Sequence, residues 1–241
     1  ARRARARLVG LGCLVIGLLG VSLFLGRYPG PYWTPLRALR EDPLALRLIL
    51  NLRLPRILSA VVVGMTLSAA GAVFQMVFRN PLVDSGFLGV SAGASFGASL
   101  AIVALGGRAL TIQLCAALFG LLGLGASYLL GRRIRYGDWV LRLVLAGIAV
   151  SALYSSGTSV LKYTADPLRQ LPDITFWLLG GLWNITWPDL VPLLAVAVPC
   201  LAILHLLRWR LNLLSMRDET AFSLGVSAGR ERMAVLLAAV I

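Results

Sequence analysis

The 241-residue sequence has few charged side chains, and acidic ones are the scarcest. Charged residues make up 14% of the chain, where a soluble domain averages about 25%, and only ten of them are Asp or Glu. All ten acidic residues lie in connecting segments or at the ends of apolar runs. Carriers driven by a proton or sodium gradient usually hold carboxylates inside their membrane-spanning segments, so this placement argues against ion coupling.

Histidine and cysteine are also rare, which argues against most metal chemistry. His205 is the single histidine, and Cys13, Cys115 and Cys200 lie far apart inside apolar runs. Zinc and iron–sulfur sites need several such ligands at close spacing, so we predict no metal site, no disulfide framework and no bound cofactor. The cysteines are typical of small buried hydrophobes. His205 stands near the end of an apolar run and fits a packed or interfacial position better than a proton relay.

The usual motifs of enzymes are missing as well. A P-loop requires G-x-x-x-x-G-K-[ST], and the only lysine, Lys162, stands in no such motif. The sequence also lacks H-E-x-x-H and a paired histidine and carboxylate. The spacing G-x-S-x-G does occur, as at 89–93 and 93–97, but it stands there in a run of small residues, and serines such as Ser91 and Ser95 suit helix packing. We therefore predict no catalytic residue, and any ATP hydrolysis must belong to a separate chain.

The sequence is rich in long apolar runs: 59% of its residues are hydrophobic and its mean hydropathy is +0.84. The full runs without an acidic residue are roughly 18–23 residues long, or about 27–35 Å as helix, which is enough to cross a bilayer. In lipid the backbone must satisfy its own hydrogen bonds, so we predict an all-α, polytopic transmembrane helical bundle. The runs fall at about 8–26, 57–78, 87–106, 109–131, 143–161 and 190–207, and a seventh begins near Met233.

The two ends of the sequence affect how these runs are counted. The first run follows ARRARAR and could be a signal peptide, but no A-x-A cleavage site follows it, so a true first helix is favoured. The chain begins without Met and ends at Ile241 in an apolar run. We expect a piece of a longer protein, in which residues 1–241 form a single transmembrane domain that is cut within its seventh span.

The positive charge is almost entirely arginine, and its placement predicts an orientation. A net charge of +13 would suggest nucleic-acid binding in a soluble protein, but here the arginines alternate with apolar runs and form no single patch. With the N-terminus inside, 14 basic residues lie in the cytoplasm and nine lie outside. The inner set is Arg2, Arg3, Arg5, Arg7, Arg79, Arg132, Arg133, Arg135, Arg142, Arg208, Arg210, Arg217, Arg230 and Arg232. Six arginines of the first outer segment blur this bias and need their own explanation: Arg27, Arg37, Arg40, Arg47, Arg53 and Arg56.

A sharp break interrupts the apolar pattern in FRNPLVDSGFLGVSAGASFG, residues 78–97. Pro81 cannot donate a backbone hydrogen bond and disfavours helix at the residue before it, so residues 79–86 are predicted as a cytoplasmic turn. Beyond the turn, glycines recur every four residues from Gly89 to Gly97 and would form one bare stripe on a helix. Such a stripe permits close helix packing in lipid. It is equally compatible with a helix beside a pathway that changes shape.

The outer segment KYTADPLRQLPDITFWLLGGLWNITWPD, residues 162–189, contains Trp177, Trp183 and Trp187 and an apolar piece too short to span a membrane. One interpretation is an aromatic belt at the membrane interface. The other is a short helix that lies across the mouth of a pathway. The residues alone leave both alternatives open.

Four stretches of the chain occur in an order that is found in a known family. They are RLPRILSAVVVGMTLSAAGAVFQMVFRNPLVDSGFLGVSAGASFGASLAI, RLVLAGIAVSAL, FWLLGGLWNITW and LNLLSMRDETAFSLGVSAGRER. Together they resemble the FecCD-type permeases. These permeases are the membrane subunits of ABC importers for iron–siderophore complexes, haem and vitamin B12. The resemblance runs from about Arg53 to the end of the chain. It implies a type II ABC importer fold of ten spans, of which about seven are present here.

The resemblance implies roles for particular positions. Arg53 and Arg56, in R-L-P-R, match contacts for acidic residues of a periplasmic binding protein; snorkelling to lipid phosphates is the alternative. The outer segment with Trp177 and Gly180 resembles the family's gating helix. In the second half of the gate the family often has small or polar residues. This chain has Trp139, Val140 and Leu141 there and so departs from the family pattern. The positions assigned to the cytoplasmic gate or the translocation path are Asn80, Leu82, Gly89, Gly93, Val140 and Leu141.

The segment 213–232 interleaves apolar and polar residues, as an amphipathic connector does, and Gly225 follows its central part as a helix end would. The resemblance implies that this segment is the coupling helix that sits in a groove on the ATPase. A rigid helix in a groove transmits motion without chemistry. The positions assigned to ATPase coupling are Arg217, Asp218, Glu219, Thr220, Ala221, Ser223, Leu224 and Gly225.

The resemblance therefore predicts a transport subunit, not an enzyme, for an iron–siderophore, haem or vitamin B12-type metal chelate. The permease would form a homodimer in the inner membrane of a bacterium or archaeon, surrounded by membrane lipid and with no bound nucleic acid. Two ATPase chains would dock inside and one periplasmic binding protein outside. The alternatives are an ion-coupled secondary transporter, a channel or a non-transporting membrane scaffold.

Overall fold

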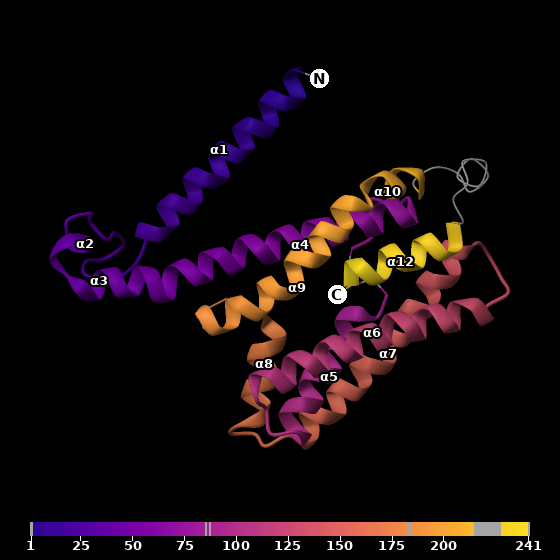
Figure 1. The fold of residues 1–241 in the computed structure, drawn as a ribbon. Coiled ribbons are helices and arrows are strands. Elements are labelled where there is room, and N and C mark those ends of the chain that lie inside the picture. Colours follow the sequence, from indigo (N-terminus) through magenta and orange to yellow (C-terminus); the bar gives the residue numbers. More distant parts are fainter. Residues whose placement is uncertain (1, 85, 87, 183–184, 215–227, 241) are drawn as a thin grey trace. The chain divides into compact units, whose positions relative to one another are not determined.

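The computed structural model describes residues 2–84, 86, 88–182, 185–214 and 228–240, and these residues are built from helices (Figure 1). Within them, the one extended pairing is an isolated antiparallel bridge between Leu25 and Trp33. The predicted all-α class is confirmed. In chain order the elements are α1 (Arg2–Phe24), α2 (Ala38–Glu41), α3 (Pro43–Leu48), η1 (Ile49–Arg53), α4 (Leu54–Phe78), α5 (Val90–Ala104), α6 (Ala109–Arg133), α7 (Trp139–Thr164), α8 (Gln170–Leu179), α9 (Trp187–Leu206), α10 (Arg208–Leu214) and α12 (Ala228–Val240).

Helical stretches long and apolar enough to cross a membrane confirm most of the predicted spans. Among the described residues there are five: Arg5–Phe24, Pro43–Phe78, Ala109–Arg133, Trp139–Thr164 and Trp187–Leu206. The span predicted over 87–106 is wrong in length, because α5 has only 15 residues. Gly89 precedes this helix with φ of 78°, and Gly106 and Gly107 follow it at 78° and 64°. These left-handed conformations, which glycine adopts without steric cost, cannot continue a right-handed helix.

The second long helix contains an irregular turn that the apolar pattern does not predict. The helix expected over 57–78 runs through α3, η1 and α4, and η1 is a π-helical turn. The indole N–H of Trp187 donates to the carbonyl of Leu50, inside this turn, at 2.9 Å. Single π-turns within α-helices occur often at functional sites, and this one ends at Arg53.

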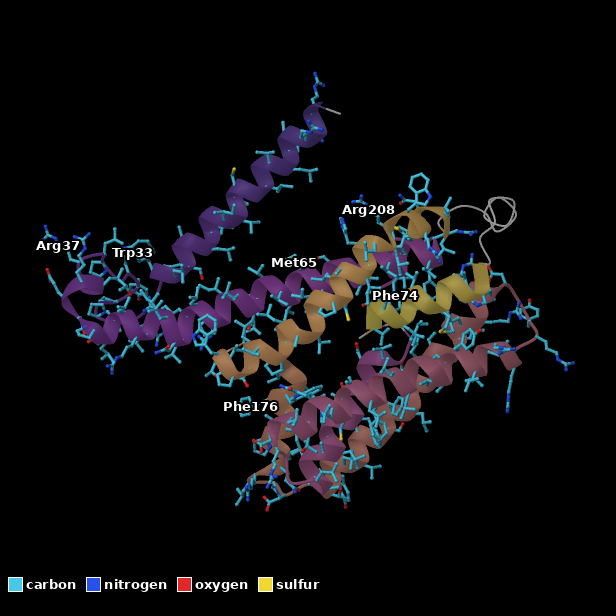
Figure 2. The ribbon with its side chains drawn as sticks, viewed as in Figure 1. Trp33, Arg37, Met65, Phe74, Phe176 and Arg208 are labelled. Carbon is cyan, nitrogen blue, oxygen red and sulfur yellow. The ribbon has the colours of Figure 1, made fainter. Side chains whose placement is uncertain are left out.

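The chain divides into two compact units, of which the first comprises residues 1–64 and 182–195. Its loop between α1 and α2 folds back on the end of α1. The N–H of Thr34 donates to the carbonyl of Phe24 at 2.8 Å. The rings of Phe24 and Trp33 stack with their centroids 5.7 Å apart. Trp33 is labelled in Figure 2. The loop is therefore a folded cap on α1.

The second unit comprises residues 65–181 and 196–241, and α5, α6 and α7 lie side by side within it (Figure 1). The helices α5 and α6 approach backbone to backbone. A Cβ atom added at Gly93 would collide with the carbonyl of Phe119, and one added at Gly97 would collide with the carbonyl of Cys115. The packing interpretation of the glycine stripe is therefore confirmed.

One large hydrophobic core holds the second unit together. Phe74, fully buried, lies at its centre, and its place on α4 is marked in Figure 2. Because several helices contribute side chains to this close-packed core, a movement of one helix displaces side chains of the others. Its buried members are Val73, Phe74, Val77, Phe78, Val83, Leu88, Leu124, Leu143, Leu204, Leu211, Leu214, Val235 and Leu236.

Candidate functional site at the inner helix ends

The end of α4 and the start of α7 meet through stacked aromatic rings. The rings of Phe74 and Phe78 have centroids 6.0 Å apart, and Phe78 stacks on Trp139 at 5.7 Å. The guanidinium of Arg232, from α12, lies over the Trp139 ring, with its Cζ atom 4.9 Å from the ring centroid. We call these four side chains the inner stack. It joins three helices that are distant in the sequence.

The inner stack is well shielded from solvent. Phe78 is 3% exposed and Arg232 is 7% exposed. A buried guanidinium needs compensation for its charge, and the electron-rich face of an indole supplies part of it. Aromatic pairs contribute about 0.5–1.5 kcal/mol beyond the burial of their area, and cation–π contacts contribute about 0.5–2 kcal/mol. The stack therefore fixes the start of α7 against the end of α4.

The first predicted gate segment follows Phe78 directly. Arg79 has a φ of 52°, and Oδ1 of Asn80 accepts a hydrogen bond from the N–H of Leu82 at 2.9 Å, as in an Asx turn. Leu82 is 89% exposed, whereas Val83 is buried in the core. The turn predicted over 79–86 is confirmed in its described residues, and it presents Leu82 outward.

The second predicted gate segment begins α7. Oδ1 of Asp138 accepts from the N–H of Leu141 at 2.8 Å and caps the helix. Val140 packs against the core, and Leu141 is 40% exposed. Trp139, which departs from the family pattern, is the residue that contacts Phe78. The two predicted segments thus meet through one ring contact, and their role as a gate stays a prediction.

The same core reaches both flanks of the predicted coupling segment. Leu214 of α10 and Leu236 of α12 are fully buried in it. The guanidinium of Arg79 donates to the carbonyl of Leu214, the last residue of α10, at 3.4 Å. The residues assigned to coupling, Arg217, Asp218, Glu219, Thr220, Ala221, Ser223, Leu224 and Gly225, lie outside the described residues. Their two flanks, however, contact the core that holds the gate segments.

The two glycines assigned to the pathway lie at helix contacts. A Cβ atom added at Gly89 would come within 2.9 Å of Cγ1 of Val150, and one added at Gly93 would meet α6. Beside them the Ser127 hydroxyl donates to the carbonyl of Leu88 at 2.8 Å in a buried position. These contacts hold α5, α6 and α7 close together at this point. A role in the pathway stays a prediction for both glycines.

The two arginines assigned to docking differ in their surroundings. The guanidinium of Arg53 donates to the carbonyl of Leu23 at 3.0 Å, to Oγ1 of Thr34 at 2.9 Å and to the carbonyl of Tyr28 at 3.5 Å. Thr34 is fully buried, so Arg53 closes the loop between α1 and α2, which we call the outer loop after its predicted side, onto the end of η1. Arg56 is exposed. The docking role of both residues stays a prediction.

The outer segment 162–189 contains the short helix that one of the two interpretations predicts. This helix, α8, ends at Gly180, which has a φ of 70°. Ile174 is fully buried, and the side-chain amide of Gln170 donates to the carbonyl of Val103 at 3.2 Å. Trp177 is 38% exposed. The helix is therefore anchored to the end of α5, and its gating role stays a prediction.

A tyrosine–carboxylate pair braces the outer loop. The hydroxyl of Tyr28 donates to Oδ2 of Asp42 at 2.6 Å. This hydrogen bond is the main reason that the pKa of Asp42 lies below its usual 3.8, and a second one from the N–H of Leu44 adds to it. The same contact is the main cause of the raised pKa of Tyr28, with burial and the charge of Asp42 adding to it. The pair therefore favours a neutral phenol beside an ionised carboxylate.

This pair predicts how the outer loop responds to pH. Because the pKa of Tyr28 is raised, the stabilisation from its neutral form is present below its ordinary value of 10.0 and is lost as the pH rises through the folded value. Because the pKa of Asp42 is lowered, its contribution is present above 3.8 and is lost as the pH falls through the folded value. In an ultraviolet tyrosinate titration, the difference between wild type and Tyr28→Phe is expected to show one phenol ionising above pH 10.0. In the Asp42→Asn background that phenol should titrate earlier; an unchanged midpoint would contradict the pairing.

Sequence patterns do not single out most of the inner stack. Phe74 and Phe78 stand four residues apart, a spacing that places both rings on one helix face, and this is the one signal that the sequence contains. The contact between Arg232 and Trp139 joins segments that no local pattern relates. Among the described residues, no group of three or more His, Cys, Asp or Glu is placed to hold a metal ion.

Comparisons with known proteins match almost the whole chain. The profile of the FecCD transport family matches residues 13–241. A solved structure described as an inward-facing conformation of a metal-chelate type ABC transporter matches with a TM-score of 0.86 and 35% sequence identity, covering 98% of this chain and 73% of that chain.

Three relatives illustrate the range of similar proteins. The molybdate import system permease protein MolB of Haemophilus influenzae is 36% identical over 236 residues, which are 95% of this chain and 69% of MolB. The hemin transport system permease protein HmuU of Yersinia pestis is 39% identical over 193 residues, covering 78% of this chain and 57% of HmuU. The vitamin B12 import system permease protein BtuC of Klebsiella pneumoniae is 34% identical over 230 residues, covering 93% of this chain and 66% of BtuC. The chain thus spans between 57% and 69% of the length of these three relatives.

Proposed function

Because the chain belongs to the FecCD transport family, we propose that it is the membrane subunit of an ABC importer that moves a metal-containing cargo across the inner membrane. The match of residues 13–241 to the family carries this proposal. We propose a metal chelate of the iron–siderophore, haem or vitamin B12 type as the cargo. The permeases named for hemin and vitamin B12 support a chelate, and the one named for molybdate adds a metal oxyanion as a second candidate.

The proposed energy source is a separate ATPase that acts on the segment 217–225 from the cytoplasm. Support comes from the packing of its flanks. The helix α10 before it and the helix α12 after it both contribute to the core that contains Phe78 and Val83. Arg79, at the start of the gate turn, donates to the carbonyl of Leu214, where α10 ends. A push on the segment would therefore be transmitted by close-packed side chains and one charged hydrogen bond.

The proposed partner on the outside is a periplasmic binding protein that docks on Arg56. Arg56 is exposed, so a partner protein can reach it, and Arg53 is half-buried and hydrogen-bonds to the outer loop and the end of α1. Rim charges mainly guide and orient the encounter of two proteins. In this proposal, Arg53 holds the outer loop in the shape that the binding protein meets, and Arg56 makes the direct contact.

These two proposed roles, loop support for Arg53 and direct contact for Arg56, predict different results when each arginine is replaced. Arg56→Glu is expected to weaken binding-protein docking, because it reverses the exposed charge that would meet acidic residues of the partner. Arg53→Ala is expected to destabilise the fold by about 2–3 kcal/mol, because it leaves partly buried acceptors without a charged donor. Docking is measured by surface plasmon resonance on the reconstituted permease, and stability by thermal unfolding in detergent. Equal docking by wild type and Arg56→Glu would show that the rim assignment is wrong.

The proposed class is tested by transport into sealed vesicles. Vesicles that contain the permease and its ATPase should accumulate the chelate only when ATP is supplied on the ATPase side and the loaded binding protein on the other. An imposed proton or sodium gradient without ATP should produce no uptake. Uptake driven by the gradient alone would identify a secondary transporter instead. Retention of a chelate by the purified binding protein would then name the cargo.

A further inference from the structure

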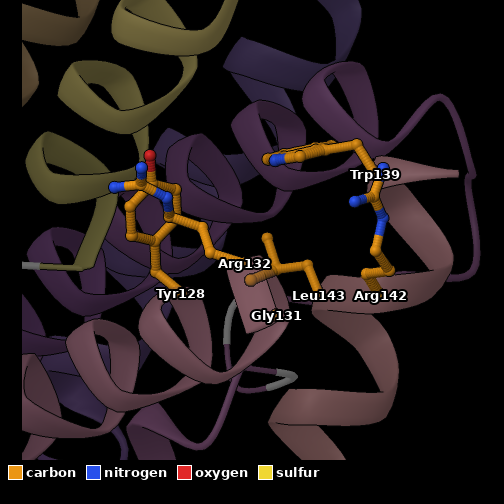
Figure 3. A pocket seen from close by; sticks show the side chains of 6 residues that line it. All are labelled: Tyr128, Gly131, Arg132, Trp139, Arg142 and Leu143. Atoms are coloured by element: carbon orange, nitrogen blue, oxygen red, sulfur yellow. The ribbon is translucent and has the colours of Figure 1, made fainter. Parts of the chain in front are cut away.

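A small pocket lies between the inner ends of α6 and α7, next to the second predicted gate segment, whose Trp139 forms part of its lining. Its volume is about 220 Å³, and it is lined by Tyr128, Gly131, Arg132, Trp139, Arg142 and Leu143. Figure 3 shows the indole of Trp139 over Leu143, with Arg132 and Arg142 on opposite sides. Sites for drug-sized ligands usually occupy about 300–1,000 Å³, so this pocket suits a smaller group.

The pocket is positively charged. The guanidinium of Arg142 donates to the carbonyl of Asp138 at 3.3 Å and to that of Ile134 at 3.4 Å. The guanidinium of Arg132 lies over the Tyr128 ring, with its Cζ atom 5.9 Å from the ring centroid. In the part of the chain that the structure describes, these contacts involve carbonyl dipoles and a ring face, neither of which neutralises the cation. Two arginines therefore line one small cavity, from opposite sides (Figure 3).

The acidic group nearest in the sequence is already engaged. Oδ1 of Asp138 accepts the hydrogen bond that caps α7, from the N–H of Leu141 at 2.8 Å. With two arginines in its lining, the pocket favours an anion, and guanidinium groups bind the oxygens of a phosphate group particularly well.

The pocket also lies at the depth where lipid headgroups are found. The helix α6 ends at Arg133 and α7 begins at Trp139, and both helices are long and apolar enough to span a membrane. Tryptophan and tyrosine at the ends of such helices favour the interface between hydrocarbon and water, and basic pockets between helix ends on the cytoplasmic side accept anionic headgroups. Trp139 and Tyr128 both line this pocket.

We propose that the pocket formed by Tyr128, Arg132, Trp139 and Arg142 binds an anionic phosphate group, supplied in the membrane by the headgroup of an anionic phospholipid. The phosphate oxygens accept hydrogen bonds from Arg132 and Arg142, and the acyl chains extend along the apolar surface of α6 and α7. Trp139 belongs to the inner stack as well. A bound headgroup therefore contacts the same ring that joins the two predicted gate segments.

The test counts lipids bound to the full-length permease in a neutral detergent. The protein is titrated with phosphatidylglycerol, with phosphatidylcholine of the same acyl chains, or with inorganic phosphate, and the adducts are counted by native mass spectrometry. We expect phosphatidylglycerol to be retained in preference to phosphatidylcholine. Arg132→Gln with Arg142→Gln is expected to weaken that retention about tenfold or more, since charged hydrogen bonds are lost. The control, Arg133→Gln with Arg135→Gln, changes the net charge equally in the same connection, outside the pocket, and should bind as wild type.

Several results would support or overturn the proposed phosphate site. Because Arg142 also holds the 134–138 turn, Arg132→Gln alone is tested too, and it should weaken retention in a fully folded protein. Retention of inorganic phosphate with the same sensitivity to Arg132 would support the phosphate site and assign it to a free anion. Equal retention of both lipids, or equal losses in the pocket and control variants, would overturn the proposal. It would also be overturned if the pocket variants kept the lipid and lost only the co-purifying ATPase, since the arginines would then be a protein contact.

Discussion

Replacing Trp139 with alanine is expected to lower the stability of the permease by about 3 kcal/mol and to uncouple ATP hydrolysis from import. The substitution removes the ring that stacks on Phe78 at 5.7 Å and that receives the guanidinium of Arg232 at 4.9 Å. It leaves a space beside the core and removes the ring face that the buried Arg232 guanidinium contacts. Without this ring, movement of α12 no longer reaches the start of α7 and the end of α4 together. The measurements are thermal unfolding in detergent and the number of ATP molecules hydrolysed for each chelate imported.

Two control variants separate the loss of this contact from a general effect of removing tryptophan. Trp139→Phe keeps a ring over Phe78 and should retain most of the coupling. Trp209→Ala removes an indole that is 72% exposed, so it should change stability by less than about 0.5 kcal/mol. If Trp139→Ala and Trp209→Ala had the same ATP requirement for import, the inner stack would have no role in coupling.

Gly93→Ala and Gly125→Ala are expected to change stability in opposite directions. A Cβ atom at Gly93 collides with the carbonyl of Phe119 on α6, which is backbone and cannot rotate away, so α5 and α6 must separate. Overpacking of this kind costs about 1–3 kcal/mol. At Gly125, also within a helix, an added Cβ has no atom within 4 Å, so the better helix propensity of alanine should add up to about 1 kcal/mol. Thermal unfolding of both variants in the same detergent measures the difference.

The sign of the Gly125→Ala effect makes this pair informative. The substitution is identical at both sites, so the difference between them reports the helix contact and nothing else. A loss of stability at both positions would indicate that glycine itself is needed for flexibility. A gain at both would show that α5 and α6 do not pack backbone to backbone.

The sequence predicts the helical architecture well, because apolar length alone determines whether a segment can cross a bilayer. The helices α1, α4, α6, α7 and α9 correspond to predicted runs for that reason. The turn after Phe78 was predictable from Pro81, which removes a backbone donor. The length of α5 was not, since apolar content does not reveal that its flanking glycines adopt left-handed conformations.

The candidate site was predicted in its segments but not in its contacts. The sequence places a gate at Asn80 and Leu82 and its second half at Val140 and Leu141. The structure brings these segments together through Phe78 and Trp139. That contact depends on the packing of distant helices, for which one sequence has no periodic signal. The π-turn that ends at Arg53 could not be predicted either, because it changes one hydrogen-bond step within a continuous helical stretch.

The most direct test of the whole account removes the segment 217–225 and measures ATP-driven uptake of the chelate in vesicles that contain every partner. The account predicts that uptake falls to the level without ATP while the permease stays folded and its binding protein still docks. A matched variant in which the same number of residues is replaced by a Gly-Ser linker controls for chain length and should fail in the same way. Uptake that continues at the wild-type rate without this segment would contradict the claim that a separate ATPase drives the permease through it.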